Sequence, residues 1–583
     1  MNRASRWILP SCDLTRVDAL ARELGIQRPA ARVLANRGYG DPDAARRFLN
    51  PHLSYLHDPL RLKDVDRAAA RLQQAIAAGE RMLLYGDYDV DGTTSIVILK
   101  KAVELAGGRA DFHVPHRLKD GYGMRPEVID RAAADGIRLI ISVDTGIRAS
   151  AVVAHAQALG IDVIVTDHHL PEAALPPALA VVNPNRPDCE YPEKNLCGAG
   201  VTFKLVQALW ARLGWSQERI RKITESFLKL VAIATVADVV PLTGENRVIV
   251  KLGLDGLHSV RNEGLRALLR VAGFHDGDRP SAGQVAFRIA PRINAAGRMD
   301  TAEDVINLFL TDDRETAERL AAQLHDLNRE RQETEAQIVN IILEACSQAP
   351  VTDAQAALVF SGKDWHRGVV GIVASRVVER FHRPVFVLGE DEESGTAQGS
   401  GRSISAFHLL EALESMPELF TKFGGHRQAA GLTLAMSDVQ IFRDRLNAYA
   451  LTKLTSEDLR PVMEPDALLQ FNELTERTVE EILALAPFGC GNSAPMFAVL
   501  GGEVCGTPAL WNEKHLRVPI RQNGRTIVVK AWNFAGRMQD LPAGCKLDFA
   551  LCLEEDPYSR DRGFPGWCAV LKDVRPSEAA ASA

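Results

Sequence analysis

The sequence of 583 residues has nine cysteines and no C-x-x-C pair among them. A disulfide framework and a cysteine-bound zinc site are therefore not indicated, and reduced thiols in a cytosolic protein are the simplest interpretation. The sequence also lacks an apolar run long enough to cross a bilayer. Its first apolar stretch ends at Asp13, which is too short for the core of a signal peptide. We expect a soluble, cytoplasmic protein with no membrane contact.

The chain also lacks a strong excess of positive charge. Its formal net charge is −7, which excludes a generally basic coat for nucleic acid, so any site for a polyanion must be local. A hydrophobic content of 46% and a charged content of 25% are ordinary for a globular protein. At roughly one domain per 100–200 residues, the length predicts three to five domains.

The first recognisable region of the chain, residues 65–240, alternates between strand and helix patterns. Short apolar or β-branched runs at 81–85, 110–114, 139–143 and 163–166 are separated by segments with helical spacing. This alternation predicts a parallel sheet covered by helices on both faces. In such sheets ligands bind outside the carboxyl ends of the strands.

The rest of the chain divides at a long predicted helix. Residues 312–346 contain no Gly or Pro and have helical spacing, with Asp312 and Glu315 resembling a capping box. A second α/β region is expected at 356–450. After 461, short strands and turns dominate, and Asn523-Gly524 between two alternating runs predicts a hairpin.

The most unusual short stretch is YGDYDVDG, in which Asp87, Asp89 and Asp91 alternate before Gly92. Like charges this close repel one another unless they are in solvent or share a cation. One interpretation is a solvated acidic turn. The other is a hard cation bound at the end of the preceding strand, because alternate carboxylates can point two oxygens at one ion.

Three further segments favour the cation. Asp144 follows an apolar run, Asp167-His168-His169 follows another, and Asp238 ends the run VAIATVA. An unpaired charge beside a buried sheet is costly, so these residues need partners. Four strand ends that present Asp and His at one edge predict shared ligation, and carboxylates with imidazole suit Mg²⁺ or Mn²⁺.

These motifs also carry a resemblance. GDYDVDG, SVDTG, TDHH and ATVADVVPL, in that order, resemble the DHH phosphoesterase superfamily, and TDHH with ATVADVVPL is similar to its RecJ branch of single-strand-specific 5′→3′ DNA exonucleases. PRINAAGRM, DWHRGVVGIVASR, GSGRS and GGHRQAAG continue the match, and the last three resemble the DHHA1 domain. The resemblance covers roughly residues 65–575. It implies a metal-dependent exonuclease that degrades single-stranded DNA from the 5′ end, in DNA repair and recombination.

The resemblance implies a domain order as well. We expect an α/β protein with the following parts: an N-terminal segment (1–64), a DHH domain with a parallel sheet (65–240), a helical extension carrying PRINAAGRM (241–311), a connecting helix (312–347), a DHHA1 α/β domain (348–455), an OB-like barrel (456–575) and a tail (576–583).

It further implies roles at the metal site, where two divalent cations, Mn²⁺ or Mg²⁺, would be held. The implied metal ligands are Asp89, Asp91, Asp144, His168 and Asp238, with Asp87 as a less certain addition. Asp144 would bridge the two ions, and His169 would face the scissile phosphate. Asp167 is predicted to orient a histidine or the backbone, or simply to cap a turn.

Substrate contacts are expected from the second half of the chain. The implied clamp for a 5′ phosphate is Arg117 with Ser400 and Arg402. Further candidates for binding the substrate are Arg292, Arg298, Arg367 and His426. The small residues of PRINAAGRM would let its backbone approach a phosphate. Each arginine alone is more often a surface or ion-pairing residue than a ligand, but as a set within the family motifs they favour substrate binding.

The C-terminal hairpin is informative on its own. With Asn523-Gly524 as the turn, one face is apolar, and the other pairs Arg521 with Thr526, Arg517 with Lys530, and His515 with Trp532. Cations beside an indole are typical of a platform that binds phosphates and stacks bases. The alternative is a solvated strand face.

Two rival functions stay open. One is a DHH phosphodiesterase for short oligonucleotides or cyclic dinucleotides, which needs no basic hairpin. The other is a non-enzymatic replication scaffold that has lost its metal ligands, which the acids here argue against. We expect a monomer, and the resemblance implies a single-stranded-DNA-binding protein and a RecQ-type helicase as partners. The sequence does not separate DNA from RNA as the substrate.

Overall fold

The computed structural model describes residues 5–117, 121, 123–299, 301–563 and 565–577. The chain forms two compact units. The central unit comprises residues 53–459, and the terminal unit comprises residues 1–52 together with 460–583. Both ends of the chain therefore belong to the same unit.

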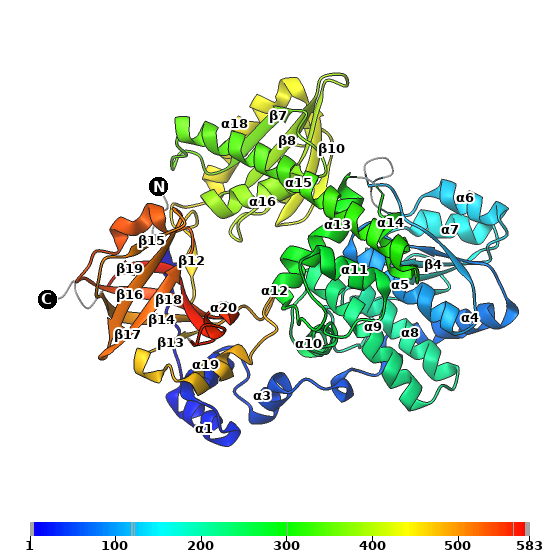
Figure 1. The fold of residues 1–583 in the computed structure, drawn as a ribbon. Helices are drawn as coiled ribbons and strands as arrows, with labels where there is room; N and C mark the ends of the chain where they lie inside the picture. The colour runs from blue at the N-terminus through cyan, green and yellow to red at the C-terminus, as the bar shows by residue number, and fades with distance from the viewer. Residues whose placement is uncertain (1–4, 118–120, 122, 300, 564, 578–583) are drawn as a thin grey trace. The chain divides into compact units, whose positions relative to one another are not determined.

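The first sheet of the central unit has five strands, all parallel, in the order β3-β2-β4-β5-β6 (Figure 1). The strands are β2 (Met82–Tyr85), β3 (Ala110–His113), β4 (Leu139–Val143), β5 (Asp162–Thr166) and β6 (Ala180–Val182). The predicted parallel sheet is confirmed. Because β2 lies between β3 and β4, the strand order reverses there, and the carboxyl ends of β2 and β4 flank the place where such sheets bind ligands.

Alternate side chains of these strands enter two separate cores. Leu84 and Ile141 pack into one core, and Leu83 and Ile140 into the other. This follows from the period of two along a strand and explains why the strands are continuous apolar runs. Helices that pack into the first core include α4 (Val65–Ala78), α5 (Val90–Leu105) and α8 (Gly198–Arg212), and α6 (Pro126–Ala134) and α7 (Ser150–Ala158) pack into the second.

A helical region follows, and it corrects one prediction. The run VAIATVA lies at the end of helix α9 (Gln217–Ala237), so Asp238 follows a helix and not a strand. A short apolar run does not distinguish a strand from the buried end of a helix. The next helices are α10 (Gly244–Gly256), α11 (Glu263–Val271), α12 (Ala282–Gln284), a π-helical segment (Val285–Ile289), α13 (Ala290–Met299) and α14 (Glu303–Leu310).

The predicted long helix is α15 (Arg314–Gln348), which leads to the second sheet of the central unit (Figure 1). Its N-cap is Asp313, whose carboxylate accepts a hydrogen bond from Thr316 N at 2.8 Å. The predicted capping box of Asp312 with Glu315 is therefore wrong by one residue, because the neighbouring aspartate has the capping geometry.

The second sheet of the central unit has the order β10-β11-β9-β8-β7 and is mixed, with only β7 and β8 parallel. It confirms the predicted second α/β region. Its strands are β7 (Leu358–Lys363), β8 (Val385–Asp391), β9 (Thr396–Arg402), β10 (Phe420–Gly425) and β11 (Ala429–Ala435). The accompanying helices are α16 (Val370–Phe381), α17 (Leu409–Glu414) and α18 (Val439–Lys453).

The terminal unit contains a barrel. Strand β14 pairs with both β18 and β16, which closes the circuit β14-β18-β19-β17-β16 and confirms the predicted OB-like barrel. Its sheet comprises β13 (Ala467–Leu468), β14 (Met496–Val504), β15 (Ala509–Trp511), β16 (His515–Gln522), β17 (Arg525–Ala531), β18 (Lys546–Glu555) and β19 (Trp567–Pro576).

The N-terminal residues are part of this unit. Helices α1 (Leu14–Leu24), α2 (Arg28–Asn36) and α3 (Pro42–Leu49) contribute side chains to the same core as the barrel. Strand β1 (Arg6–Trp7) pairs with β12 (Val462–Met463). The remaining helices are α19 (Glu476–Leu483) and α20 (Pro557–Arg560).

The hairpin of β16 and β17 has the predicted register. Arg517 lies opposite Lys530 and Arg521 opposite Thr526. The turn residues Asn523 and Gly524 have φ values of 50° and 76°. A two-residue hairpin turn of type I′ requires positive φ at both of these positions.

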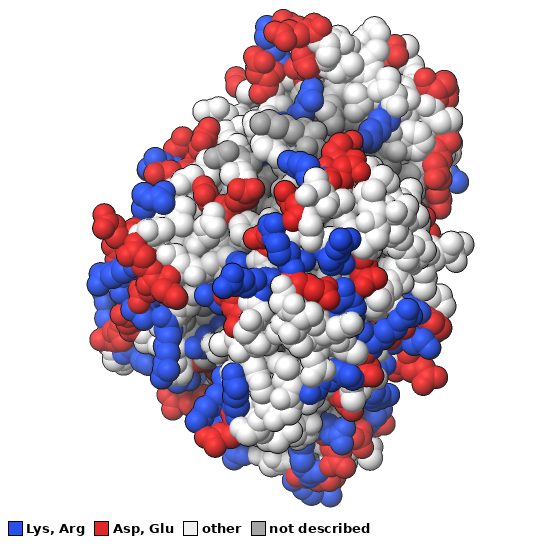
Figure 2. All heavy atoms as spheres, turned by 90° about the vertical axis from the view of Figure 1, so that its right-hand side faces the viewer, with Lys and Arg blue, Asp and Glu red and all other residues white. Residues whose placement is uncertain are grey.

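Among the described residues, no helix combines the length and the apolar character needed to span a membrane. On the face shown in Figure 2, Lys and Arg are interspersed with Asp and Glu, and neither sign covers the surface. Any binding of a polyanion on this face must therefore depend on local groups.

Candidate metal centre

Seven acidic and imidazole side chains converge at the carboxyl edge of the first sheet. They come from the ends of three strands and one helix, with Asp87 and Asp89 after β2, Asp91 in the first turn of α5, Asp144 after β4, His168 and His169 after β5, and Asp238 after α9. The structure thus brings together all the residues predicted to bind metal.

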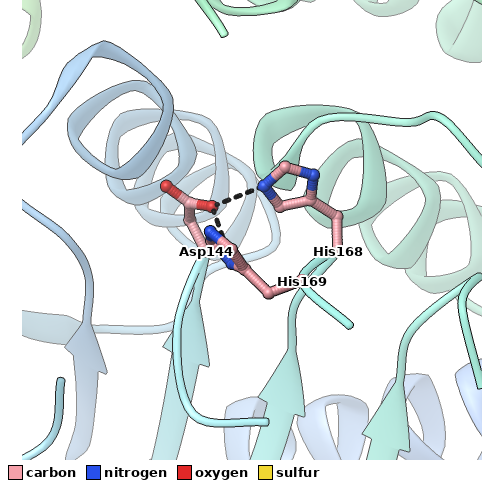
Figure 3. Close-up of side chains that lie close together, drawn as sticks. All are labelled: Asp144, His168 and His169. Atoms are coloured by element: carbon pink, nitrogen blue, oxygen red, sulfur yellow. Dashed lines mark ion pairs between the residues drawn. The ribbon is translucent and has the colours of Figure 1, made fainter. Parts of the chain in front are cut away.

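His168 lies at the middle of this group. Its Nε2 is 3.3 Å from Asp144 Oδ1 and 3.8 Å from Asp91 Oδ2, and its Nδ1 is 3.7 Å from Asp238 Oδ2. His169 Nδ1 is 4.0 Å from Asp144 Oδ1. Figure 3 shows the Asp144 carboxylate directed at both imidazole rings.

Three groups of these side chains have ligand atoms within 4.8 Å of one another. The groups are Asp87–Asp89–Asp144, Asp91–His168–Asp238 and Asp144–His168–His169. Asp144 belongs to two of the three, which is the placement that the predicted bridging role requires.

The backbone around Asp144 is adapted to this placement. Asp144 has a left-handed φ of 59°, which costs a non-glycine residue about 1–3 kcal/mol. The first residue of α8, Gly198, lies against it, and a Cβ atom on Gly198 would come within 2.6 Å of the Asp144 side chain. Only glycine lets the start of α8 approach so closely.

The same helix start holds a second acid. The Asp91 carboxylate accepts hydrogen bonds from Gly198 N at 2.5 Å and from Ala199 N at 2.8 Å. A carboxylate at a helix N-terminus is favoured by the helix dipole and the free N–H groups. The position of Asp91 is therefore fixed by α8.

Asp89 has a structural role that we did not predict. It is the N-cap of α5, and its Oδ1 accepts hydrogen bonds from Asp91 N at 2.9 Å and Gly92 N at 3.0 Å. The helix begins at Val90, within the acidic stretch, because that stretch itself provides the cap.

Asp167 orients the histidines, as predicted. Its Oδ1 lies 2.7 Å from His169 Nδ1 and accepts the N–H groups of His168 and His169. Burial raises the pKa of Asp167, but the hydrogen bonds with His169 outweigh it and lower the pKa below its usual value. In turn, burial lowers the pKa of His169, but Asp167 raises it above its usual value.

The negative charges of the remaining acids are poorly compensated by nearby groups. Burial, with repulsion from neighbouring carboxylates, raises the pKa of Asp87 to about 8 and that of Asp238 to about 9. It also raises the pKa of Asp144 well above the usual range. In the described part of the chain, Asp87 Oδ1, Asp144 Oδ1 and Asp238 Oδ2 are buried and have no hydrogen-bond partner.

Such orphaned carboxylate oxygens are costly unless a positive charge joins them. The donor atoms are hard carboxylate oxygens with imidazole nitrogen and no thiolate among the grouped ligands. This set fits Mg²⁺ or Mn²⁺. Because the oxygens are buried, the alternative interpretation of a solvated acidic turn is excluded.

Positive charge gathers beside the acidic loop. Burial, together with the nearby charges of Arg117 and Arg402, lowers the pKa of Arg298 to about 10. Arg402 Nη1 donates to Ser400 Oγ at 2.7 Å, and the Arg117 guanidinium lies 5.0 Å from the centroid of the Tyr88 ring. The predicted phosphate clamp and Arg298 are thus brought together.

The motif PRINAAGRM supports the acidic loop in an unexpected way. It forms helix α13, in which Asn294 Oδ1 accepts a hydrogen bond from Val90 N at 3.2 Å. A Cβ atom on Gly297 would come within 2.4 Å of Tyr88 O. The small residue therefore lets α13 pack against the acidic loop, and the approach of its backbone to a phosphate stays a prediction.

The other predicted contacts are dispersed. Arg292 Nε lies 3.2 Å from His325 Nδ1, apart from the arginine cluster. Arg367 is ion-paired with Asp391 at 3.2 Å but lines a depression of about 730 Å³ with Arg117. His426 lines a different cavity together with His168 and His169.

The predicted platform on the hairpin is partly occupied by ion pairs. Arg521 pairs with Glu503 at 3.0 Å, and Lys530 pairs with Asp556 at 2.6 Å. Arg517 instead lies over the ring of Trp511, 5.0 Å from its centroid.

Three aromatic rings complete this surface. The Trp532 ring is 5.1 Å from Trp511 and 4.8 Å from His515, between centroids. Arg517 and Trp532 are therefore in one cluster, while Arg521 and Lys530 are held by acids.

Comparison with known proteins agrees with this geometry. Three family models match: the DHH family N-terminal domain at residues 81–235, the DHHA1 domain at 353–452 and the RecJ OB domain at 465–563. The single-stranded-DNA-specific exonuclease RecJ of Dickeya dadantii is 39% identical over 85% of this chain and 86% of its own length. The chain belongs to the RecJ family.

Other RecJ proteins extend the comparison. The relative from Bacillus subtilis is 38% identical over 92% of this chain, which spans only 66% of that longer protein. A crystal structure of RecJ from Thermus thermophilus with Mn²⁺ has a TM-score of 0.83 and 33% identity, over 99% of this chain and 80% of that chain. A second, with Mg²⁺, has a TM-score of 0.77 and 32% identity, over 98% of this chain and 79% of that one.

Some residues of this RecJ-family site were missed at the sequence level. Tyr88 and Asn294 lie within quoted motifs, but their contacts depend on how α13 packs, which no spacing reveals. Gly198 belongs to the segment CGAG, whose paired glycines are a signal for close backbone approach. Trp511 was missed because β15 is only three residues long.

Proposed function

We propose that this chain is a divalent-metal-dependent exonuclease that hydrolyses single-stranded DNA from its 5′ end. The observation that carries the proposal is the set of three buried carboxylate oxygens, on Asp87, Asp144 and Asp238, that accept no hydrogen bond within the described part of the chain. The names of the RecJ relatives and the Mn²⁺ and Mg²⁺ in the Thermus thermophilus structures support the same substrate and metals.

The proposed ligands of two cations are Asp89, Asp91, Asp144, His168 and Asp238, with Asp87 as a further candidate. Bound cations would supply Lewis acidity, which activates water and stabilises the leaving 3′ oxygen of a phosphodiester. The α8 start holds Asp91, and the Asp89 cap holds the first turn of α5, so the ligand positions are fixed before metal binds.

His169 is proposed to face the scissile phosphate. Asp167 holds its Nδ1 edge, which leaves Nε2 as the atom able to donate to a phosphate oxygen. Asp167 raises the pKa of His169 above its usual value, and an imidazolium there would neutralise charge that develops on the phosphate.

Polarity is proposed to come from the arginine cluster. Arg117, Ser400 and Arg402 would hold the terminal 5′ phosphate, and Arg298 would add positive charge beside them. Arginine binds phosphate with charge-assisted, often bidentate hydrogen bonds. A phosphate fixed there would place the first phosphodiester bond at the metal centre, so cleavage would begin at the 5′ end.

The terminal unit is proposed to hold the strand farther along, through Arg517 and the rings of Trp511 and Trp532. The barrel favours an exonuclease over a phosphodiesterase for short substrates, and the complete acid set disfavours a scaffold without metals. A role in DNA repair and recombination, action as a monomer in the cytoplasm, and partnership with a single-stranded-DNA-binding protein and a RecQ-type helicase stay predictions.

The test is a digestion of single-stranded DNA labelled at either end, with duplex DNA as a control, with and without Mn²⁺. The expected result is immediate release of the 5′ label as a mononucleotide, only with metal and only from single strands. Early release of the 3′ label, or equal digestion of duplex, would contradict the proposal.

A further inference from the structure

A cavity of about 760 Å³ lies beside the metal centre on the side of β4 and β5. Met124, Ile147, Val152 and Leu170 form its apolar wall, and His169 lines it as well. Cavities of about 300–1,000 Å³ with an apolar wall and a few polar groups are typical of sites for small molecules. His169 also lies near Asp144, so an occupant of this cavity would be adjacent to the metal centre.

Two features of the wall have unmet hydrogen-bonding capacity. Thr145 is 2% exposed, and its hydroxyl has no hydrogen-bond partner in the described part of the chain. Helix α7 begins at the cavity. Its N-cap residue is Ala149, so no side chain at the cap accepts a hydrogen bond from the first N–H groups of the helix. A buried hydroxyl and an uncapped helix start both favour an oxygen-rich ligand such as a sugar phosphate.

The position of the cavity along the sheet indicates which part of a DNA strand it would take. Arg117 follows β3, the metal-centre acids follow β2 and β4, and the cavity lies at the ends of β4 and β5. With the strand order β3-β2-β4-β5, Arg117 of the proposed clamp and the cavity lie on opposite sides of the end of β2, which is followed by Asp87 and Asp89.

We propose that this cavity binds the nucleoside immediately 3′ of the scissile phosphate, which is the second nucleotide of the strand. This inference rests on the proposed function and names a subsite for it. Val152 and Leu170 contact the face of the base, and Thr145 binds the sugar–phosphate.

The experiment measures the second-order rate constant of the first cleavage in single turnover, with Mn²⁺ and 5′-phosphorylated strands. An abasic residue is placed at position 2 or, as a reference, at position 4. In the wild-type protein the abasic residue at position 2 should lower the rate constant about tenfold relative to position 4, because the apolar contact of one base with Val152 and Leu170 is removed.

The variant Val152→Trp fills the cavity. It should lower the rate constant on intact strands about tenfold and remove the difference between positions 2 and 4. Ala154→Trp is the matched control, since Ala154 is exposed on the same helix and does not line the cavity. It should behave as the wild type. Leu170→Ala, at an exposed position, is a second variant and should reduce the difference without filling the cavity.

Equal rates for the two abasic strands in the wild type would overturn the subsite while leaving the proposed function intact. The subsite would also be overturned if Val152→Trp and Leu170→Ala both keep the wild-type difference in rate between the strands that are abasic at positions 2 and 4. A wild-type protein that digests none of the strands would instead contradict the proposed function itself, and the subsite with it.

Discussion

The metal centre and the barrel hairpin were both singled out by charged residues at alternate positions, yet the structure treats them in opposite ways. At the metal centre, three buried carboxylate oxygens accept no hydrogen bond among the described residues. At the hairpin, two of the three cations have acidic partners, the exposed Arg521 with Glu503 and the partly buried Lys530 with Asp556. Buried charge without enough compensation indicates a missing ion, whereas charge that is already compensated is stable without one.

The two regions should therefore differ in how they fail. Removing one ligand from a shared metal site leaves the other buried charges uncompensated, so the whole site is affected. Exposed ion pairs contribute only about 0–1 kcal/mol, so loss of the exposed pair of Arg521 with Glu503 should cost the fold little. We expect all-or-none behaviour at the metal centre and small, separable effects at the hairpin.

The largest effect is expected from Asp144→Asn. Asparagine accepts the left-handed backbone of this position, so the fold is kept while the charge shared by two ligand groups is removed. Exonuclease activity should fall by several orders of magnitude, while metal-free binding of single-stranded DNA is largely kept. Asp87→Asn, which touches one ligand group, is the matched comparison and should lose less activity.

Turnover near the wild-type level for Asp144→Asn in Mn²⁺ would rule out a bridging role. Equal losses in the two variants would show that the carboxylates are ranked wrongly. Circular dichroism and thermal unfolding of both variants provide the control for folding.

A smaller effect is expected from Arg402→Ala. If this side chain and Ser400 hold the terminal phosphate, the variant should lose the preference for 5′-phosphorylated over 5′-hydroxyl strands. Removal of a charge-assisted hydrogen bond costs roughly 1.5–3 kcal/mol. The ratio of kcat/KM for the two kinds of end measures this loss, and an equal drop on both ends would contradict the clamp.

The smallest effects belong to the hairpin. Neutralising Arg517, Arg521 and Lys530 together should flatten the dependence of log Kd on log salt, by about 0.7 for each phosphate that is no longer neutralised. Because acids hold Arg521 and Lys530, we expect Arg517→Ala alone to account for most of the change. Trp532→Ala should weaken binding by about 1–3 kcal/mol with little change in slope, because stacking releases no counterions.

Binding curves at several salt concentrations check these hairpin effects, and turnover at saturating DNA should survive all of the substitutions. Glu503→Gln is a useful control, since it frees Arg521 and should strengthen binding slightly at low salt. An unchanged slope in the triple variant would mean that this strand face is only solvated.

The sequence was most informative where a single strand determines the position of a side chain. The runs before Asp144 and Asp167 are buried strands, so their position at one sheet edge follows from the parallel order alone. The Asn523-Gly524 turn determined the hairpin register for the same local reason. The sequence did not reveal contacts that depend on distant packing, such as that of Gly297 with Tyr88.

The acidic partners of the hairpin were unpredictable for a related reason. Glu503 lies on the neighbouring strand β14, and Asp556 precedes α20, so neither lies near the hairpin in the chain. The identity of Asp238 as a site residue was predicted, but the helix that carries it was not, because VAIATVA has no periodicity that favours a helix over a strand.

The stoichiometry of Mn²⁺ binding tests the central claim most directly. Electron paramagnetic resonance of free Mn²⁺, titrated with the metal-free protein, counts the ions bound to each chain. The account predicts two ions per chain for the wild type and a loss of at least one in Asp144→Asn, with thermal unfolding of the wild type shifted upward by Mn²⁺. A wild-type protein that binds no Mn²⁺, or an Asp144→Asn variant that binds as many ions as the wild type, would contradict it.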